Sequence, residues 1–143
     1  MIKLPPGVYI NNLIDDLKSF SWEASDILLK YAQIIKDSNN KSNILTNKSL
    51  EDPVTIADLK VNEIIINNIN ESYKNINWEI LSEENAKINS KNRSINGDFL
   101  WVLDPLDGTK DFIQGTENYA MHLALNYKNK PYLGIVLIPE KEE

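Results

Sequence analysis

The chain is organised around one stretch, Trp101-Val102-Leu103-Asp104-Pro105-Leu106-Asp107-Gly108-Thr109-Lys110-Asp111-Phe112. Residues 99–103 are aromatic, apolar and β-branched, which predicts a buried strand. Pro105 and Gly108 are expected to end that strand, because proline lacks a ladder N–H and glycine marks turns. Asp104 and Asp107 would then lie at the C-terminal end of a strand, where ligands bind in open α/β sheets.

A short helix is predicted directly after this turn, over residues 109–114. Thr109 is expected to cap it, and the free backbone N–H groups of such an N-terminus attract an anion. Two carboxylates beside that point would repel a phosphate unless a divalent cation lay between them. The stretch therefore predicts a metal ion and a phosphate group bound together.

Composition limits the class of protein. The 143 residues suffice for one domain with a core, and 42% hydrophobic with 25% charged residues is typical of a globular chain. A formal net charge of -6 and the lack of any Lys/Arg-rich block argue against nucleic acid and favour a small partner. The absence of cysteine excludes disulfides, thiolate metal sites and Cys nucleophiles, and fits a cytoplasmic location. Neither a signal peptide nor a membrane segment is expected.

Two amphipathic helices are predicted in the first half of the chain. Residues 12–38 carry an apolar stripe close to a seven-residue repeat, made by Leu13, Leu17, Phe20, Ala24, Ile27 or Leu28, Tyr31, and Ile34 or Ile35. Acidic residues interrupt any basic surface on this helix, so core packing is favoured over a membrane or partner face. The second helix covers residues 56–73, and Thr55 stands three residues before Asp58, as in a capping box. Taken alone, Asp58 is better explained as a first-turn carboxylate than as a functional group.

The remaining strands are short and end in turns. Residues 77–82 are predicted to form a strand ending at Glu83-Glu84, before a polar loop over 85–97, and residues 43–49 a short extended segment or hairpin. Residues 119–127 and 132–138 predict two antiparallel strands joined by a four-residue turn, with His122 as a packed or edge residue. The last strand is followed at once by a charged end. Its outer edge is therefore expected either to pair with another chain, by self-association, or to continue in a longer one.

Carboxylates thus follow in a fixed order along the chain: Asp58, then Glu83-Glu84, then Asp104 and Asp107. Hard oxygen ligands of this kind suit Mg²⁺, which keeps several waters and is shared with substrate phosphate. One such motif would be weak evidence. Three of them in this order, each beside a turn, make a Mg²⁺-dependent phosphate site the preferred interpretation.

In this order the motifs resemble those of the inositol monophosphatase superfamily of magnesium-dependent phosphatases. The matching elements are Pro53 to Asp58, Leu81 to Asn85, and Asp104 to Phe112. Lys110-Asp111-Phe112 indicates one subgroup of this superfamily. It resembles the motif of the CysQ-like 3'(2'),5'-bisphosphate nucleotidases, whereas inositol monophosphatases usually carry Asn-Phe there. The resemblance covers about residues 13–139, and the family's later Trp-Asp motif has no counterpart in this sequence.

The resemblance implies a fold. It is α/β (α+β layered), with two N-terminal helices packed on a mostly antiparallel sheet, the N-terminal half of the αβαβα sugar-phosphatase fold. Residues 1–143 would be the N-terminal metal- and phosphate-binding domain of a truncated phosphatase, without the C-terminal α/β half.

The resemblance also implies metal ligands. Glu83, Asp104 and the Leu106 backbone carbonyl would hold one Mg²⁺, and Asp104 and Asp107 would contribute to a second. Asp58, with Glu83, would serve a third metal or its water.

Catalytic and substrate roles follow from the same likeness. Asp58 and Thr109 would orient or deprotonate the attacking water, and the Gly108 and Thr109 amides would cradle the phosphate. Lys110 would either contact substrate or lie exposed, and Glu84 would support its neighbour. The implied reaction removes the 3'-phosphate of adenosine 3',5'-bisphosphate, with poor activity expected because the Trp-Asp carboxylate is missing. Two alternatives stay open: an inositol or sugar monophosphatase, and a non-catalytic metal- or phosphate-binding or interaction module.

Overall fold

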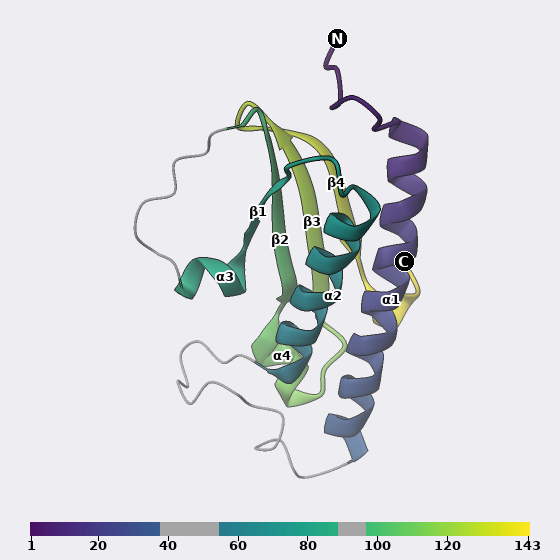
Figure 1. The fold of residues 1–143 in the computed structure, drawn as a ribbon. Helices are drawn as coiled ribbons and strands as arrows, with labels where there is room; N and C mark the ends of the chain where they lie inside the picture. Colours follow the sequence, from purple (N-terminus) through teal and green to yellow (C-terminus); the bar gives the residue numbers. More distant parts are fainter. Residues whose placement is uncertain (38–54, 89–96) are drawn as a thin grey trace.

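The structure, a computed structural model, describes residues 1–37, 55–88 and 97–143. Its elements, in chain order, are α1 (Ile10–Asp37), α2 (Ile56–Ser72), β1 (Glu79–Ser82), α3 (Glu83–Ile88), β2 (Phe99–Asp107), α4 (Thr109–Gln114), β3 (Ala120–Tyr127), β4 (Lys130–Leu137) and the 3-10 turn η2 (Pro139–Lys141). Helices α1 and α2 lie side by side on one face of the sheet (Figure 1). The predicted layered α/β fold is therefore confirmed.

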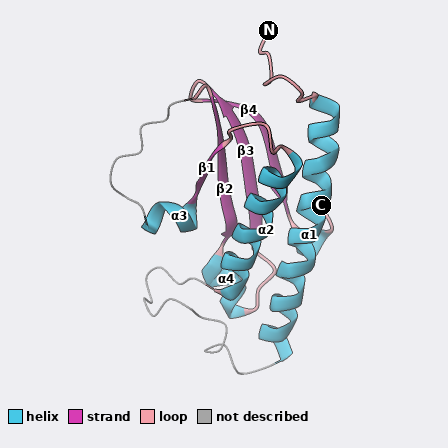
Figure 2. Cartoon of the chain, in the orientation of Figure 1, coloured by secondary structure: helices cyan, strands magenta, loops and turns pink. Residues whose placement is uncertain are grey.

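The sheet is mixed and has the strand order β1-β2-β3-β4 (Figure 2). Strand β1 pairs in parallel with β2, whereas β2 with β3 and β3 with β4 are antiparallel. The expectation of a mostly antiparallel sheet is thus confirmed. Because β1 and β2 run in the same direction, their C-terminal ends meet at one edge of the sheet, and the acidic motifs lie there.

Helix periodicity predicted the core well. On α1, the apolar stripe is buried at Leu13, Leu17, Phe20, Ala24, Leu28 and Ile35, and Ile34 is the exposed member of its pair. On α2, Val61, Ile65 and Ile69 are buried, whereas Leu59 is exposed. These side chains pack against alternate residues of the two central strands, namely Trp101, Leu103, Met121, Leu123 and Leu125. The core thus lies between the helix pair and one face of β2 and β3.

The prediction that Pro105 ends the central strand was wrong. Strand β2 runs on to Asp107, and its pairing with β3 is irregular between Asp104 and Asp107. Pro105 lies within this irregularity, so its missing N–H removes no regular ladder bond.

Two other turns also differ from expectation. The hairpin between β3 and β4 has two residues instead of four, because Lys128 and Asn129 both adopt positive φ and pairing resumes at Lys130. Glu83-Glu84, predicted as the end of a strand, and the first residues of the loop predicted over 85–97 instead form helix α3. Ser82 followed by two acidic residues is a helix-start signal that outweighed the polar composition of the loop.

Some expectations lie outside the described residues, among them the extended segment at 43–49 and the loop from residue 89 to 96. Within the described residues, no helix is both long and apolar enough to cross a membrane.

Candidate metal and phosphate site

The parallel pairing of β1 with β2 brings two acidic motifs together. Ser82 is the register partner of Leu103, so the next residues, Glu83 at the start of α3 and Asp104 within β2, lie at the same edge of the sheet. The two side chains form a hydrogen bond, which requires a proton between their carboxyl groups. Glu83 is exposed and Asp104 is partly buried, so this pair stands at the boundary of core and solvent.

The surroundings of Asp104 disfavour its charged form and raise its pKa. Burial, the hydrogen bond and charge of Glu83, and the charge of Asp107 together raise the pKa of Asp104 to about 7. One interaction opposes them: the Leu106 backbone N–H donates to Asp104 Oδ1 at 3.2 Å. Three carboxyl groups, those of Glu83, Asp104 and Asp107, therefore influence one another at this sheet edge.

Asp58 is bonded to Thr55 at the start of α2 and is linked to the turn after β2 through Thr109. The Thr55 N–H donates to Asp58 Oδ2 at 2.9 Å and the Asp58 N–H donates to Thr55 Oγ1 at 3.3 Å, which confirms the predicted capping box. Thr109 Oγ1 lies 3.3 Å from Asp58 Oδ1 and 3.1 Å from the Leu106 carbonyl oxygen. Asp58 is almost fully buried, and burial raises its pKa despite these hydrogen bonds.

The capping box gives a stability prediction. Thr55→Ala removes the side-chain acceptor for the Asp58 N–H and the hydroxyl bonded to Asp58, so a loss of about 1–2 kcal/mol in unfolding free energy is expected. Thr55→Ser keeps the hydroxyl and is the matched control. Urea unfolding measures both variants, and equal midpoints for Ala and Ser would contradict the capping role.

Thr109 does not cap helix α4 as expected. Gly108 occupies the N-cap position with φ of 81° and makes no side-chain cap, and Thr109 is the first helical residue. The hydroxyl of Thr109 is turned toward Asp58 and the Leu106 carbonyl instead. The Gly108 carbonyl accepts the Phe112 N–H at 2.9 Å, which begins the helix. Lys110 is exposed on the first turn.

The turn at Gly108 packs against the backbone of the segment before β3. A Cβ atom at Gly108 would lie 2.5 Å from the Asn118 carbonyl oxygen, so only glycine fits this approach. The neighbouring Tyr119 packs its ring edge-on against Phe112, with centroids 4.9 Å apart, and donates its hydroxyl to Glu140 at 2.9 Å. The backbone around Gly108 and Thr109 is thus fixed by core packing.

The residues present fit a hard cation in their chemistry. Glu83, Asp104, Asp107 and the Leu106 carbonyl offer only oxygen. Burial and the neighbouring carboxyl groups raise the pKa of Asp104, and a divalent cation would offset the charge of these carboxylates. Among the described residues, however, no three acidic, histidine or cysteine side chains are already close enough together to hold a metal ion. The cluster is therefore the right donor set in an open arrangement, not a closed cage.

Sequence reasoning missed two neighbours of the site. Ser82 Oγ hydrogen-bonds Asn62 Oδ1, and Asn62 Nδ2 donates to Asn85 Oδ1 at 3.4 Å, so helix α2 is tied to the strand end that carries Glu83. His122 is the cross-strand register partner of Asp104. Asn62 lies one helical turn after Asp58 on the inner face of α2, which is a signal for its place near the site. Nothing local to residue 122 indicated which strand position it would oppose.

Comparisons with known proteins identify the family of the chain. The model of the Inositol monophosphatase family matches residues 12–143. The 3'(2'),5'-bisphosphate nucleotidase CysQ of Haemophilus influenzae is 38% identical over 87 residues, 61% of this chain and 31% of that protein. The Nus factor SuhB of Pasteurella multocida is 35% identical over 98 residues, 68% of this chain and 34% of that protein. The predicted resemblance to this family and to CysQ is confirmed.

Solved structures show the same fold. The crystal structure of extragenic suppressor protein suhB from Bartonella henselae superposes with a TM-score of 0.71 at 21% identity, over 92% of this chain and 47% of that one. The matched region thus spans about a third of the length of the two curated relatives and about half of the solved chain.

Proposed function

Because the chain belongs to the inositol monophosphatase family, we propose that its acidic sheet edge binds Mg²⁺ and supports hydrolysis of a phosphate monoester. The observation that carries this proposal is the gathering of Glu83, Asp104 and Asp107 at one sheet edge, where burial and the two neighbouring carboxyl groups raise the pKa of Asp104 to about 7. The family is generally metal-dependent, and an all-oxygen donor set favours Mg²⁺ over softer ions.

Each residue would have a distinct part in the reaction. Glu83, Asp104, Asp107 and the Leu106 carbonyl would hold the cation, which when bound activates water, offsets phosphate charge and stabilises the leaving oxygen. Asp58 and the Thr109 hydroxyl, 3.3 Å apart, would orient the attacking water and accept its proton. The raised pKa of Asp58 makes its carboxylate a better proton acceptor than an exposed aspartate.

The phosphate would lie over the turn between β2 and α4. Gly108 and Thr109 would offer backbone N–H groups there, held in place by the contact with the Asn118 backbone. Lys110 is exposed on the same turn and would reach a second phosphate of the substrate.

Adenosine 3',5'-bisphosphate is the favoured substrate. Its support is the Lys110-Asp111-Phe112 motif together with the 38% identity to a protein named as a bisphosphate nucleotidase. Not every relative is named as a nucleotidase, since one at 35% identity is named as a Nus factor. Inositol or sugar monophosphate is therefore the alternative substrate class, and non-catalytic binding of metal or phosphate is the alternative function.

Substrate choice is tested by comparing two phosphate esters. With Mg²⁺ present, we expect a low but measurable kcat/KM for adenosine 3',5'-bisphosphate that exceeds the value for inositol 1-phosphate. Lys110→Ala should lower kcat/KM for the bisphosphate by about tenfold and leave the monophosphate rate unchanged, because only the bisphosphate carries the extra charge. Equal loss on both esters would contradict the role of Lys110, and the reverse preference would favour the inositol phosphatase.

A further inference from the structure

Asn62 connects two of the acidic motifs. It follows Asp58 by four residues, so both side chains leave the same face of α2, one helical turn apart. The Asn62 amide meets the end of β1, where Ser82 Oγ donates to Asn62 Oδ1. Ser82 is fully buried and is followed at once by Glu83, the first residue of α3. One side chain therefore links the helix that carries Asp58 to the strand end that carries Glu83.

The chemistry of an amide suits this position. Asn62 Nδ2 donates to Asn85 Oδ1 at 3.4 Å, so the same side chain accepts a hydrogen bond from the end of β1 and donates one to the first turn of α3. A carboxylate could only accept, and an aliphatic side chain could do neither. The two partners, Ser82 and Asn85, flank Glu83 along the chain. Together the two bonds hold the backbone from which the Glu83 carboxyl group projects.

The separation of Glu83 and Asp58 matters for the proposed cation. Glu83 is hydrogen-bonded to Asp104, and Asp58 is buried and linked to Thr109 Oγ1 at 3.3 Å. Both carboxyl groups would serve the metal ion or its water. Mg²⁺ demands near-ideal octahedral geometry with short metal–oxygen distances, so it tolerates little change in the spacing of its partners. A group that fixes this spacing therefore controls metal affinity without being a ligand.

We propose that Asn62 is a positioning residue for the Mg²⁺ site, which sets the separation of Glu83 from Asp58 through its hydrogen bond with Ser82. This inference rests on the proposed function, because it needs a cation at the acidic sheet edge. Side chains that orient metal ligands by hydrogen bonds commonly change metal affinity by about 10- to 100-fold when they are replaced. Asn62 acts one residue away from the ligand, so the lower end of that range is expected.

Calorimetric titration of Mg²⁺ into the 143-residue chain at pH 7 tests the positioning role. Asn62→Ala should raise the dissociation constant for Mg²⁺ by about tenfold. Ser82→Ala removes only the hydroxyl partner and should also weaken binding. The variant with both changes should bind no more weakly than Asn62→Ala alone, because both substitutions remove the same hydrogen bond.

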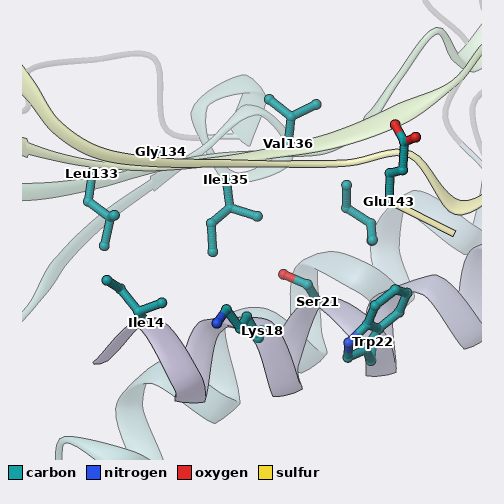
Figure 3. A pocket seen from close by; sticks show the side chains of 10 residues that line it. Ile14, Lys18, Ser21, Trp22, Leu133, Gly134, Ile135, Val136 and Glu143 are labelled. Carbon is teal, nitrogen blue, oxygen red and sulfur yellow. The ribbon is translucent and has the colours of Figure 1, made fainter. Parts of the chain in front are cut away.

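Ser21→Ala is the matched control. Ser21 is also a buried serine, and its hydroxyl donates to the Leu17 carbonyl at 2.7 Å within α1. Figure 3 shows Ser21 at a groove of about 250 Å³ between α1 and β4, the strand at the opposite edge of the sheet from β1. The control thus removes a buried hydroxyl far from the acidic motifs and should leave the Mg²⁺ dissociation constant unchanged.

Amide hydrogen exchange in EDTA gives a second readout that needs no metal. Exchange over residues 79–88, which form β1 and α3, should become about tenfold faster in Asn62→Ala and stay unchanged in Ser21→Ala. Circular dichroism checks that the variants fold, and Ser82→Ala tests the same bond if Asn62→Ala does not.

The outcomes separate this inference from the proposed function. Unchanged Mg²⁺ affinity in Asn62→Ala and Ser82→Ala, with binding by the unaltered chain, would overturn the positioning role and leave the metal site standing. An equal loss of affinity in Ser21→Ala, or unchanged exchange over residues 79–88 in Asn62→Ala, would also overturn the positioning role. Absence of Mg²⁺ binding by the unaltered chain would overturn the proposed function, and the positioning role with it.

Discussion

Asp104→Asn is expected to lower phosphate ester hydrolysis by about a hundredfold or more and, in the same chain, to raise the stability of the metal-free protein at pH 8. Activity is lost because an amide cannot supply the charge that holds the cation. Stability rises because the amide removes one of three crowded carboxylates while it still accepts the Leu106 N–H. An ordinary structural aspartate would show the opposite change in stability.

The pH dependence follows from the same group. The pKa of Asp104 is about 7 in the fold, above the ordinary 3.8 of an aspartate, so protonation favours the folded state. This contribution is complete below about pH 4 and is lost as pH rises through about 7. The full shift corresponds to about 4 kcal/mol. Since the carboxyl group is only partly buried, solvent screening reduces the expected gain at pH 8 to about 1 kcal/mol.

Urea unfolding in EDTA at pH 5 and pH 8 measures this effect. The unaltered chain should lose stability between the two values relative to Asp104→Asn. Asp98→Asn, an exposed aspartate just before the same strand, is the control and should change neither activity nor stability. A variant that is both inactive and less stable at pH 8 would show that Asp104 supports the fold rather than the chemistry.

Gly108→Ala is expected to lower the unfolding free energy by about 3 kcal/mol and to reduce activity together with stability. Two effects add at this position. The backbone has φ of 81°, which an alanine adopts at a cost of about 1–2 kcal/mol. The new Cβ would also lie 2.5 Å from the Asn118 carbonyl oxygen, a backbone atom that moves only if the turn and the start of β3 separate.

Gly115→Ala separates these two effects. Gly115 ends the same helix with φ of 78°, but its nearest neighbour to a Cβ is a side-chain atom of Ile35 at 3.9 Å. This variant should therefore lose only the conformational contribution, about 1–2 kcal/mol. If both variants unfold at the same denaturant concentration, the close packing of Gly108 against Asn118 has no energetic importance.

Local patterns in the sequence predicted the parts of the fold that depend on local rules. Helices α1 and α2 follow from apolar spacing, and the Thr55 to Asp58 capping box follows from a three-residue interval. The polar composition of 85–97 predicted a loop over residues that partly belong to α3, because composition does not register the helix-start signal of Ser82 followed by two acidic residues. The prediction that Pro105 ends the strand was wrong for a different reason. Whether its missing N–H matters depends on the partner strand, which no local pattern describes.

The site, too, combines features that local sequence predicts with features that tertiary packing sets. That Glu83 and Asp104 belong to one site could be expected from two motifs at strand ends. Their hydrogen bond depends on the parallel register of Ser82 with Leu103, and the turn of the Thr109 hydroxyl toward Asp58 depends on how α2 packs against β2. Both are set by tertiary packing, which spacing along the chain does not encode. The assigned roles of Glu83, Asp104, Leu106 and Asp107 as Mg²⁺ ligands stay predictions.

Calorimetric titration of Mg²⁺ into the 143-residue chain at pH 7 tests this ligand assignment most directly. Two buffers of different ionisation enthalpy should be used, because a cation that displaces the proton between Asp104 and Glu83 releases it to the buffer. We predict saturable binding with proton release, lost in Asp104→Asn and kept in Asp98→Asn. The absence of saturable binding by the unaltered chain, or equal binding by Asp104→Asn, would contradict the acidic sheet edge as a metal site.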